Sequence, residues 1–126
     1  MRMKNFLLVL AAALVQLASF AQGDSSVEFP PSSTVPTAPE LKAHLSGKSF
    51  RARYADGTMV QTKFDADGGL AATAPDFYDT GRWRVENGKV CGSLRKAGDF
   101  CNDARLESGA LYLRSMSGEV VRYEPQ

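Results

Sequence analysis

The sequence predicts an all-β domain: an antiparallel meander of about eight short strands that forms a small barrel or sandwich, preceded by one short helix. Three observations lead to this fold class. Apolar and polar residues alternate over most segments after residue 48, which is strand spacing. Turn signals recur about every 8–12 residues. Most of these turns are too short for parallel crossovers, which need about a dozen residues or more.

Residues 1–21 are expected to be a cleavable secretory signal peptide ending at Ala21. Arg2 and Lys4 supply the positive start, and an apolar run covers residues 6–17. This run is shorter than the about 20 residues that a membrane-spanning helix needs. We therefore expect a periplasmic or secreted protein with no stable membrane insertion after processing; an uncleaved amphipathic or anchoring helix is the alternative.

Residues 22–37 are rich in Ser, Pro and Thr and poor in aliphatic side chains. Such a segment buries too little apolar surface to offset the entropy lost on ordering. The composition predicts a disordered tether here, and residues 38–126 then form a single β domain.

A helix of two turns is expected at the start of that domain. Thr37 can cap it, and Glu40 stands three residues on, as a capping box requires. Gly47 supplies the end. Leu41 and Leu45 lie four residues apart on one helix face, so they are expected to pack on the domain.

The strands are expected between hairpin signals. Asp56-Gly57, Asp67-Gly68 and Asn87-Gly88 are turn dipeptides. The expected strands cover residues 50–54, 59–64, 70–74, 82–86, 90–94, 100–106, 111–113 and 120–123. A barrel of this size is normally filled by its own side chains, here Phe50, Phe64, Trp83 and Leu113.

The chain has two cysteines, Cys91 and Cys101, and an exported protein meets an oxidising compartment, so a disulfide is expected. Its loop of about eleven residues should add roughly 2.5–3 kcal/mol of stability. A hairpin centred on Lys96 places the cysteines directly opposite each other. A hairpin centred on Gly98 pairs Cys91 nearer Ala104 and needs a diagonal bridge; we favour the first register.

The charge balance excludes some partners. Loss of Arg2 and Lys4 leaves 13 basic and 14 acidic residues, a formal charge of −1 in place of +1. A near-neutral domain gives no electrostatic reason to expect nucleic acid or an anionic membrane as a partner. No cofactor and no metal site are expected, since two cysteines alone make a poor zinc site. The oligomeric state is left open.

Several motifs resemble, taken together, an uncharacterised family of small exported bacterial proteins. The pattern is a Leu-x-Gly-Lys-x-Phe opening at residues 45–50, a Gly-x-Trp motif at residues 81–83, and two downstream cysteines, Cys91 and Cys101. The similarity covers about residues 40–123. It implies a periplasmic or secreted β domain and no known activity.

Three further motifs have ordinary structural interpretations. His44, the only histidine, has no catalytic or ligating partners in the local sequence. The segment 65–68 echoes the start of a calcium loop, but the later ligands are missing, so a hairpin turn is favoured. Five basic residues fall on the outward phase of their strands and are expected to form a solvated face paired with acids: Arg51, Arg53, Lys63, Arg82 and Arg84.

The segment 75–81 is the candidate binding site. It is expected to be the longest irregular stretch of the domain, and binding residues concentrate on such loops. Asp76, Phe77, Tyr78 and Asp79 would form the centre of a recognition patch. The alternative is that Phe77 and Tyr78 close one end of the barrel, while Asp79 and Thr80 shape the turn into the next strand.

Three functions remain open. The first is a non-enzymatic binding module of the bacterial envelope that recognises another envelope or secreted protein. The second is a small barrel that carries an apolar ligand, which a cavity in the barrel would favour. The third is an enzyme of unknown type, placed last because the sequence offers no acid–base or nucleophilic set.

Overall fold

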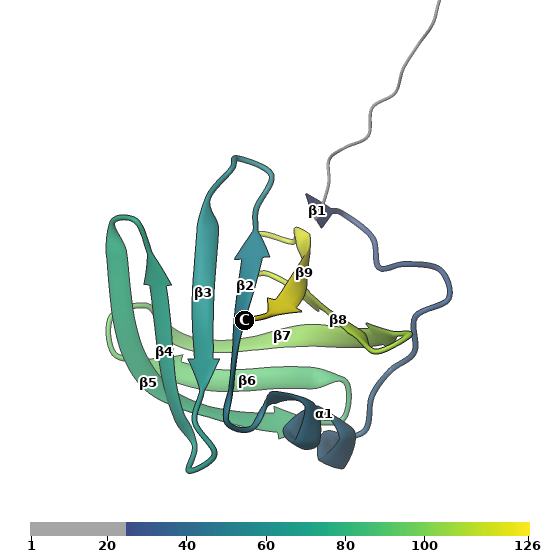
Figure 1. Cartoon of the computed structure of the whole chain (residues 1–126), viewed down its shortest axis with the longest axis horizontal. Helices are drawn as coiled ribbons and strands as arrows, with labels where there is room; N and C mark the ends of the chain where they lie inside the picture. Colours follow the sequence, from purple (N-terminus) through teal and green to yellow (C-terminus); the bar gives the residue numbers. More distant parts are fainter. Residues whose placement is uncertain (1–24) are drawn as a thin grey trace, which may run out of the picture.

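The computed structural model describes residues 25–126. Within this range, eight antiparallel strands, β2 to β9, each pair with the next along the chain, and β9 also pairs with β2 to close a barrel (Figure 1). The predicted all-β class and barrel are confirmed. The strands are β2 (Lys48–Arg53), β3 (Met59–Phe64), β4 (Gly69–Ala74), β5 (Phe77–Glu86), β6 (Lys89–Leu94), β7 (Gly98–Glu107), β8 (Ala110–Arg114) and β9 (Val120–Pro125).

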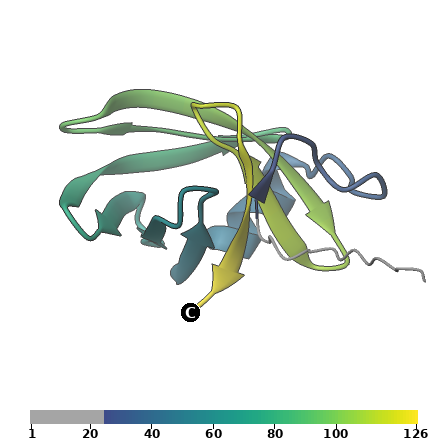
Figure 2. The same cartoon turned by 90° about the horizontal axis from the view of Figure 1, so that it is seen from above.

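The barrel has two unlike ends. Helix α1 (Ala38–Leu45) lies at one end, opposite the turns that join β2 to β3 and β4 to β5 (Figure 1). Seen from above, β5, β6 and β7 form one side of the barrel, and β2, β3 and β4 form the other (Figure 2). No helix within residues 25–126 is long and apolar enough to cross a membrane.

Helix α1 begins as predicted. The Thr37 hydroxyl accepts a hydrogen bond from the Glu40 N–H at 3.2 Å, and the Glu40 carboxylate accepts one from the Thr37 N–H at 2.9 Å. These reciprocal bonds form a capping box. Leu41 and Leu45 are fully buried, so the helix closes its end of the barrel with apolar side chains.

We call the half of the barrel next to α1 the closed half. Its aromatic side chains make edge contacts with one another. Trp83 is 7% exposed and packs edge-on against Phe64, with 5.3 Å between ring centroids. Phe64 in turn packs edge-on against Phe50 at 5.9 Å. The Trp83 indole N–H donates to the Asp65 carbonyl at 2.9 Å. Trp83 is therefore a core residue, as its place on the apolar phase of the strand predicted.

Residues 25–37 are not the predicted disordered tether. Strand β1 (Ser25–Ser26) pairs with β9, and Thr34 exchanges backbone hydrogen bonds of 2.8 and 2.9 Å with Leu106 on β7. Pro36 is buried and its carbonyl accepts from the Gly88 N–H at 2.8 Å. The composition argument failed because it counted apolar area alone, whereas hydrogen bonds to the barrel order this segment. The expected signal peptide and residues 22–24 lie outside the described residues.

Residues 75–81 are not the predicted irregular loop either. Only Pro75 and Asp76 form the turn, and β5 begins at Phe77, which pairs with Ala74 on β4. Strand β5 therefore extends about five residues further toward the turn than the alternation over residues 82–86 indicated. The reason is that β4 supplies a backbone partner to each of residues 77–82, and pairing overrides the weak local signal.

Candidate functional site

The barrel holds a cavity of about 310 Å³ in the half away from α1. Inward-facing side chains of β3, β4, β6 and β7 line it, together with the β6–β7 and β8–β9 turns. This volume lies at the lower end of the roughly 300–1,000 Å³ that small-molecule sites occupy. The expectation that the barrel is filled entirely by its own side chains is therefore wrong for this half.

Small side chains leave this space open. In the closed half, Leu41 and Leu45 from the helix and the aromatic cluster fill the interior. In the open half, the small residues Ala72 on β4 and Ala97 and Gly98 at the β6–β7 turn line the wall. These three positions help to keep the cavity open, because longer side chains there would extend into it.

One wall of the cavity is apolar. Leu70 and Ala72 on β4, Val90 and Leu94 on β6, and Phe100 on β7 contribute it. Of these, Leu70 and Val90 are buried and also belong to the core. An apolar molecule that covered this wall would gain about 25 cal/mol for each Å² removed from water.

Hydroxyl groups lie on a second part of the lining, which we call the hydroxyl wall, just after β2 and on β3 and β9, beside the apolar Val60 and Phe64. Tyr54, Thr62 and Tyr123 line the cavity there. Burial raises the pKa of Tyr123, although a hydrogen bond with the Thr62 hydroxyl opposes the rise. Burial also raises the pKa of Tyr54, and the nearby Tyr123 and Glu119 add to the rise. Both phenols are therefore neutral donors and acceptors at physiological pH.

Exposed residues at the rim show where the cavity meets solvent. Met116, at the tip of the β8–β9 turn, is 75% exposed, and Asp99 and Ser117 beside the opening are exposed too. Single exposed apolar side chains are common on protein surfaces, so Met116 marks the position of the opening and does not by itself indicate a ligand.

The residues predicted from sequence divide into two groups. Asp76, Phe77 and Tyr78 are exposed, with Phe77 at 40% and Tyr78 at 56%. They form an aromatic turn at the β4–β5 connection, outside the residues that line the cavity. The alternative in which both rings plug the barrel end is not what the structure shows, because both rings are exposed.

Asp79 has a structural role and does not belong to the exposed patch. It is 2% exposed, and its carboxylate accepts hydrogen bonds from the N–H groups of Thr80, Lys96 and Ala97 at 2.9 to 3.1 Å. Burial acts to raise the pKa of Asp79, but these backbone donors outweigh it and hold the pKa below its ordinary value. Asp79 thus fixes the β6–β7 turn, one rim of the cavity.

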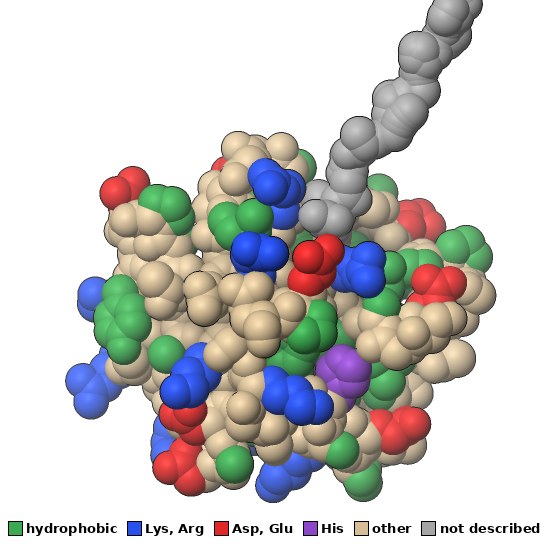
Figure 3. Space-filling view, in the orientation of Figure 1, with side chains coloured by type: hydrophobic (Ala, Val, Ile, Leu, Met, Phe, Trp, Pro, Cys, Tyr) green, Lys and Arg blue, Asp and Glu red, His purple; other side chains and the backbone are tan. Residues whose placement is uncertain are grey.

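The basic side chains on the outer face are dispersed among acidic and neutral ones (Figure 3). Lys63 lies 3.6 Å from the Asp65 carboxylate, and Arg84 lies 3.8 Å from that of Glu86. Arg82 donates to the Asp67 carbonyl at 2.8 Å. This agrees with the predicted solvated face, in which such exposed pairs add little stability.

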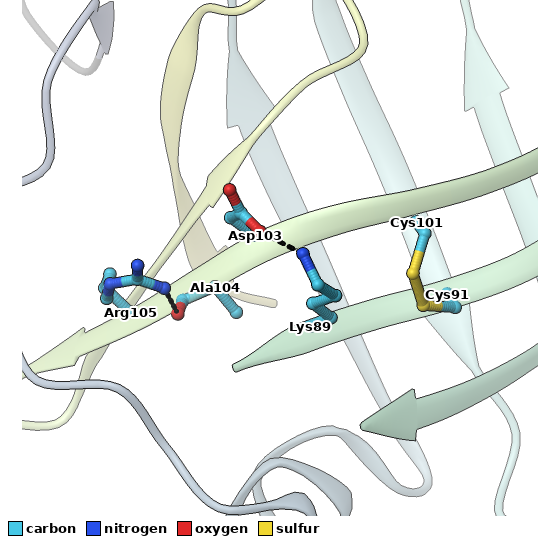
Figure 4. A network of polar contacts seen from close by, with 6 residues as sticks. All are labelled: Lys89, Cys91, Cys101, Asp103, Ala104 and Arg105. Carbon is cyan, nitrogen blue, oxygen red and sulfur yellow. Dashed lines mark hydrogen bonds and ion pairs between the residues drawn. A yellow bond between two sulfur atoms is a disulfide. The ribbon is translucent and has the colours of Figure 1, made fainter. Parts of the chain in front are cut away.

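The β6–β7 hairpin carries the disulfide, which joins the buried Cys91 to the exposed Cys101 (Figure 4). Cys91 and Cys101 are directly opposite, with 3.9 Å between Cα atoms, and they are bonded to each other. The predicted pairing and the register centred on Lys96 are confirmed. Beside them Lys89 donates to Asp103 at 2.7 Å, a hydrogen bond that lowers the pKa of Asp103.

The remaining motifs are structural. His44 is half-buried and stacks on Phe50 at 6.0 Å, and burial followed by the charge of Lys48 lowers its pKa. Asp65 and Gly68 close the β3–β4 turn with a 3.0 Å backbone hydrogen bond, as the turn interpretation predicted. Among the described residues, one group of potential ligand atoms lies close together, Glu86 with the two cysteine sulfurs, but the disulfide leaves no thiolate to bind a metal.

Comparison with protein-family models and with curated proteins finds no match for this chain. The resemblance to a family of small exported proteins therefore stays a prediction. The cavity itself was missed from sequence, although a signal was present. Ala72 and Gly98 on the inward phase leave room, and Thr62 and Asn102 on the same phase are polar where a filled core would be apolar.

Proposed function

We propose that this domain binds a small apolar molecule in the open half of its barrel. The observation that carries the proposal is the cavity of about 310 Å³, apolar on one wall and open to solvent at a rim that bears the exposed Met116. Single-domain barrels of about eight strands can hold one small ligand when their interior is not filled. Binding, rather than catalysis, is the proposed activity.

The location of the protein belongs to the same proposal. A disulfide joins Cys91 to Cys101, and disulfides persist in oxidising compartments. Together with the expected signal peptide at residues 1–21, this supports a periplasmic or secreted carrier. Such a carrier would move or sequester apolar molecules that dissolve poorly in the water around it.

Filling the cavity tests the proposal. Ala72 faces the cavity, whereas its neighbour Ala71 lies on the opposite phase of β4 and does not line it. Naphthalene, an uncharged hydrocarbon, is titrated into isotopically labelled protein, and amide shifts are followed by NMR. Wild type and Ala71→Phe should show saturable shifts on the cavity strands, and Ala72→Phe should not. Equal shifts in Ala72→Phe, or none in the wild type, would contradict the proposal.

A second candidate is the recognition of another envelope or secreted protein by the aromatic turn. The observation that favours it is the exposure of Phe77 and Tyr78, since aromatic side chains dominate binding hot spots. The double variant Phe77→Ala, Tyr78→Ala should keep the melting temperature of the wild type and lose saturable capture of a protein from envelope extract. A large fall in melting temperature would show that the rings stabilise the barrel instead.

A further inference from the structure

The charge of the cavity limits what it can bind. None of the lining residues that the structure describes is Lys, Arg or His, and the acidic Asp99 lies at the rim. Lys96, next to the rim residue Ala97, donates its ammonium group to the Tyr78 carbonyl at 2.9 Å. No cationic side chain therefore lines the cavity to receive a carboxylate or phosphate.

The hydroxyl wall supplies the opposite preference. A hydroxyl group both donates and accepts, so Thr62 and Tyr123, which are hydrogen-bonded to each other, and Tyr54 can each still meet a neutral polar group. Because the phenols stay neutral, they offer no charge to a ligand. The cavity is thus mostly apolar and carries neutral hydrogen-bonding groups at Tyr54, Thr62 and Tyr123.

We propose that the ligand is an uncharged molecule with a hydroxyl or carbonyl group set against the hydroxyl wall, and that the cavity excludes carboxylates. This inference rests on the proposed function and names the ligand class of the same site. The size follows from the volume: at about 30 Å³ for a group the size of a water molecule, 310 Å³ holds roughly ten such groups.

The physical reason is the cost of burying charge. An ionised carboxylate taken from water into a site without a cation loses far more hydration than the site returns. A neutral hydroxyl loses less hydration and recovers it through one hydrogen bond. Two ligands of equal apolar area should therefore differ strongly in affinity when only one of them is ionised.

Calorimetric titration with three related probes tests this inference: naphthalene, 2-naphthol and 2-naphthoate, at neutral pH. We expect 2-naphthol to bind tightest, and 2-naphthoate to bind at least about tenfold more weakly than 2-naphthol, a difference of about 1.4 kcal/mol. Equal or tighter binding of 2-naphthoate would overturn the inference while leaving the proposed function intact. If all three probes bind more weakly than about 1 mM, both fail.

A matched pair of variants locates the polar contact. Tyr54 lines the cavity, whereas Tyr112 lies on the outward phase of β8. In Tyr54→Phe, the advantage of 2-naphthol over naphthalene should fall by about three- to tenfold, and in Tyr112→Phe it should not change. A ratio that is the same in Tyr54→Phe and wild type would overturn the assignment of the hydroxyl wall, since a merely structural loss would weaken both probes alike.

Discussion

Removal of the Trp83 side chain should destabilise the closed half of the barrel severely. The side chain is 7% exposed, and a buried aromatic side chain covers about 150–250 Å². At about 25 cal/mol per Å² this corresponds to about 4–6 kcal/mol. Measured aromatic-to-alanine changes in cores cost about 3–5 kcal/mol, and we expect Trp83→Ala to fall in that range.

The matched control is Trp83→Phe. A phenyl ring can keep the edge contact with Phe64 but loses the indole N–H that donates to the Asp65 carbonyl at 2.9 Å. One net hydrogen bond and part of the ring area are lost, so we expect a cost of about 1–2 kcal/mol. The carbonyl of Asp65 lies in a turn, where water can replace the lost donor.

The assay is urea unfolding followed by far-ultraviolet circular dichroism, because both variants lack the single tryptophan that fluorescence would report. The disulfide is kept oxidised throughout. A total stability of about 5–15 kcal/mol is typical of a small domain, so Trp83→Ala should be marginally folded at best. A loss of less than about 1 kcal/mol in the free energy of unfolding of Trp83→Ala would refute the reasoning, because it would show that Trp83 contributes little to the core.

Other predictions concern the disulfide, the buried carboxylate and the N-terminal segment. Replacing Cys91 and Cys101 by Ser should lower the free energy of unfolding by about 2–4 kcal/mol, measured by urea unfolding; free thiols in the denatured, non-reduced wild type would contradict the bond. Because the pKa of Asp79 is lowered on folding, its stabilisation is present above the unfolded value of about 3.9 and is lost as pH falls through the folded value. Melting temperatures of wild type and Asp79→Asn should therefore converge on acidification, and a constant difference would argue against this account. The Thr34 amide, bonded to the Leu106 carbonyl at 2.8 Å, should be protected from hydrogen exchange; exchange at the random-coil rate would mean that residues 25–37 are not held on the barrel.

Most of the fold could be predicted because hairpin chemistry is local. Asn87-Gly88 fixes the β5–β6 turn, where Gly88 has φ of 71°, a conformation that costs glycine little. The alternation at Phe50 and Phe64 set which faces point inward. The disulfide at Cys91 then supplied a register that local signals leave ambiguous, because it requires Cα atoms within about 7 Å.

The errors arose where partners distant in sequence decide the structure. Phe77 and Tyr78 extend a strand because β4 lies beside them, which their neighbours in sequence do not reveal. The sequence indicates that Asp79 is a loop carboxylate. It is buried instead, because the Lys96 and Ala97 N–H groups of another hairpin donate hydrogen bonds to it. The candidate site was therefore only partly predictable: the exposed aromatic turn was found, and the cavity was not.

The cavity depends on side-chain volume, which a pattern of apolar and polar residues does not record. Ala72 and Trp83 both occupy inward positions on neighbouring strands and count equally as apolar in a sequence pattern. Their effects differ, because Trp83 fills the half that α1 closes and Ala72 leaves the other half open. A substitution that removes volume at Trp83 costs stability, whereas one that adds volume at Ala72 extends into the cavity and need cost little. Stability and binding should thus separate along the barrel axis, so that variants of the closed half lose folding and variants of the open half lose the ligand.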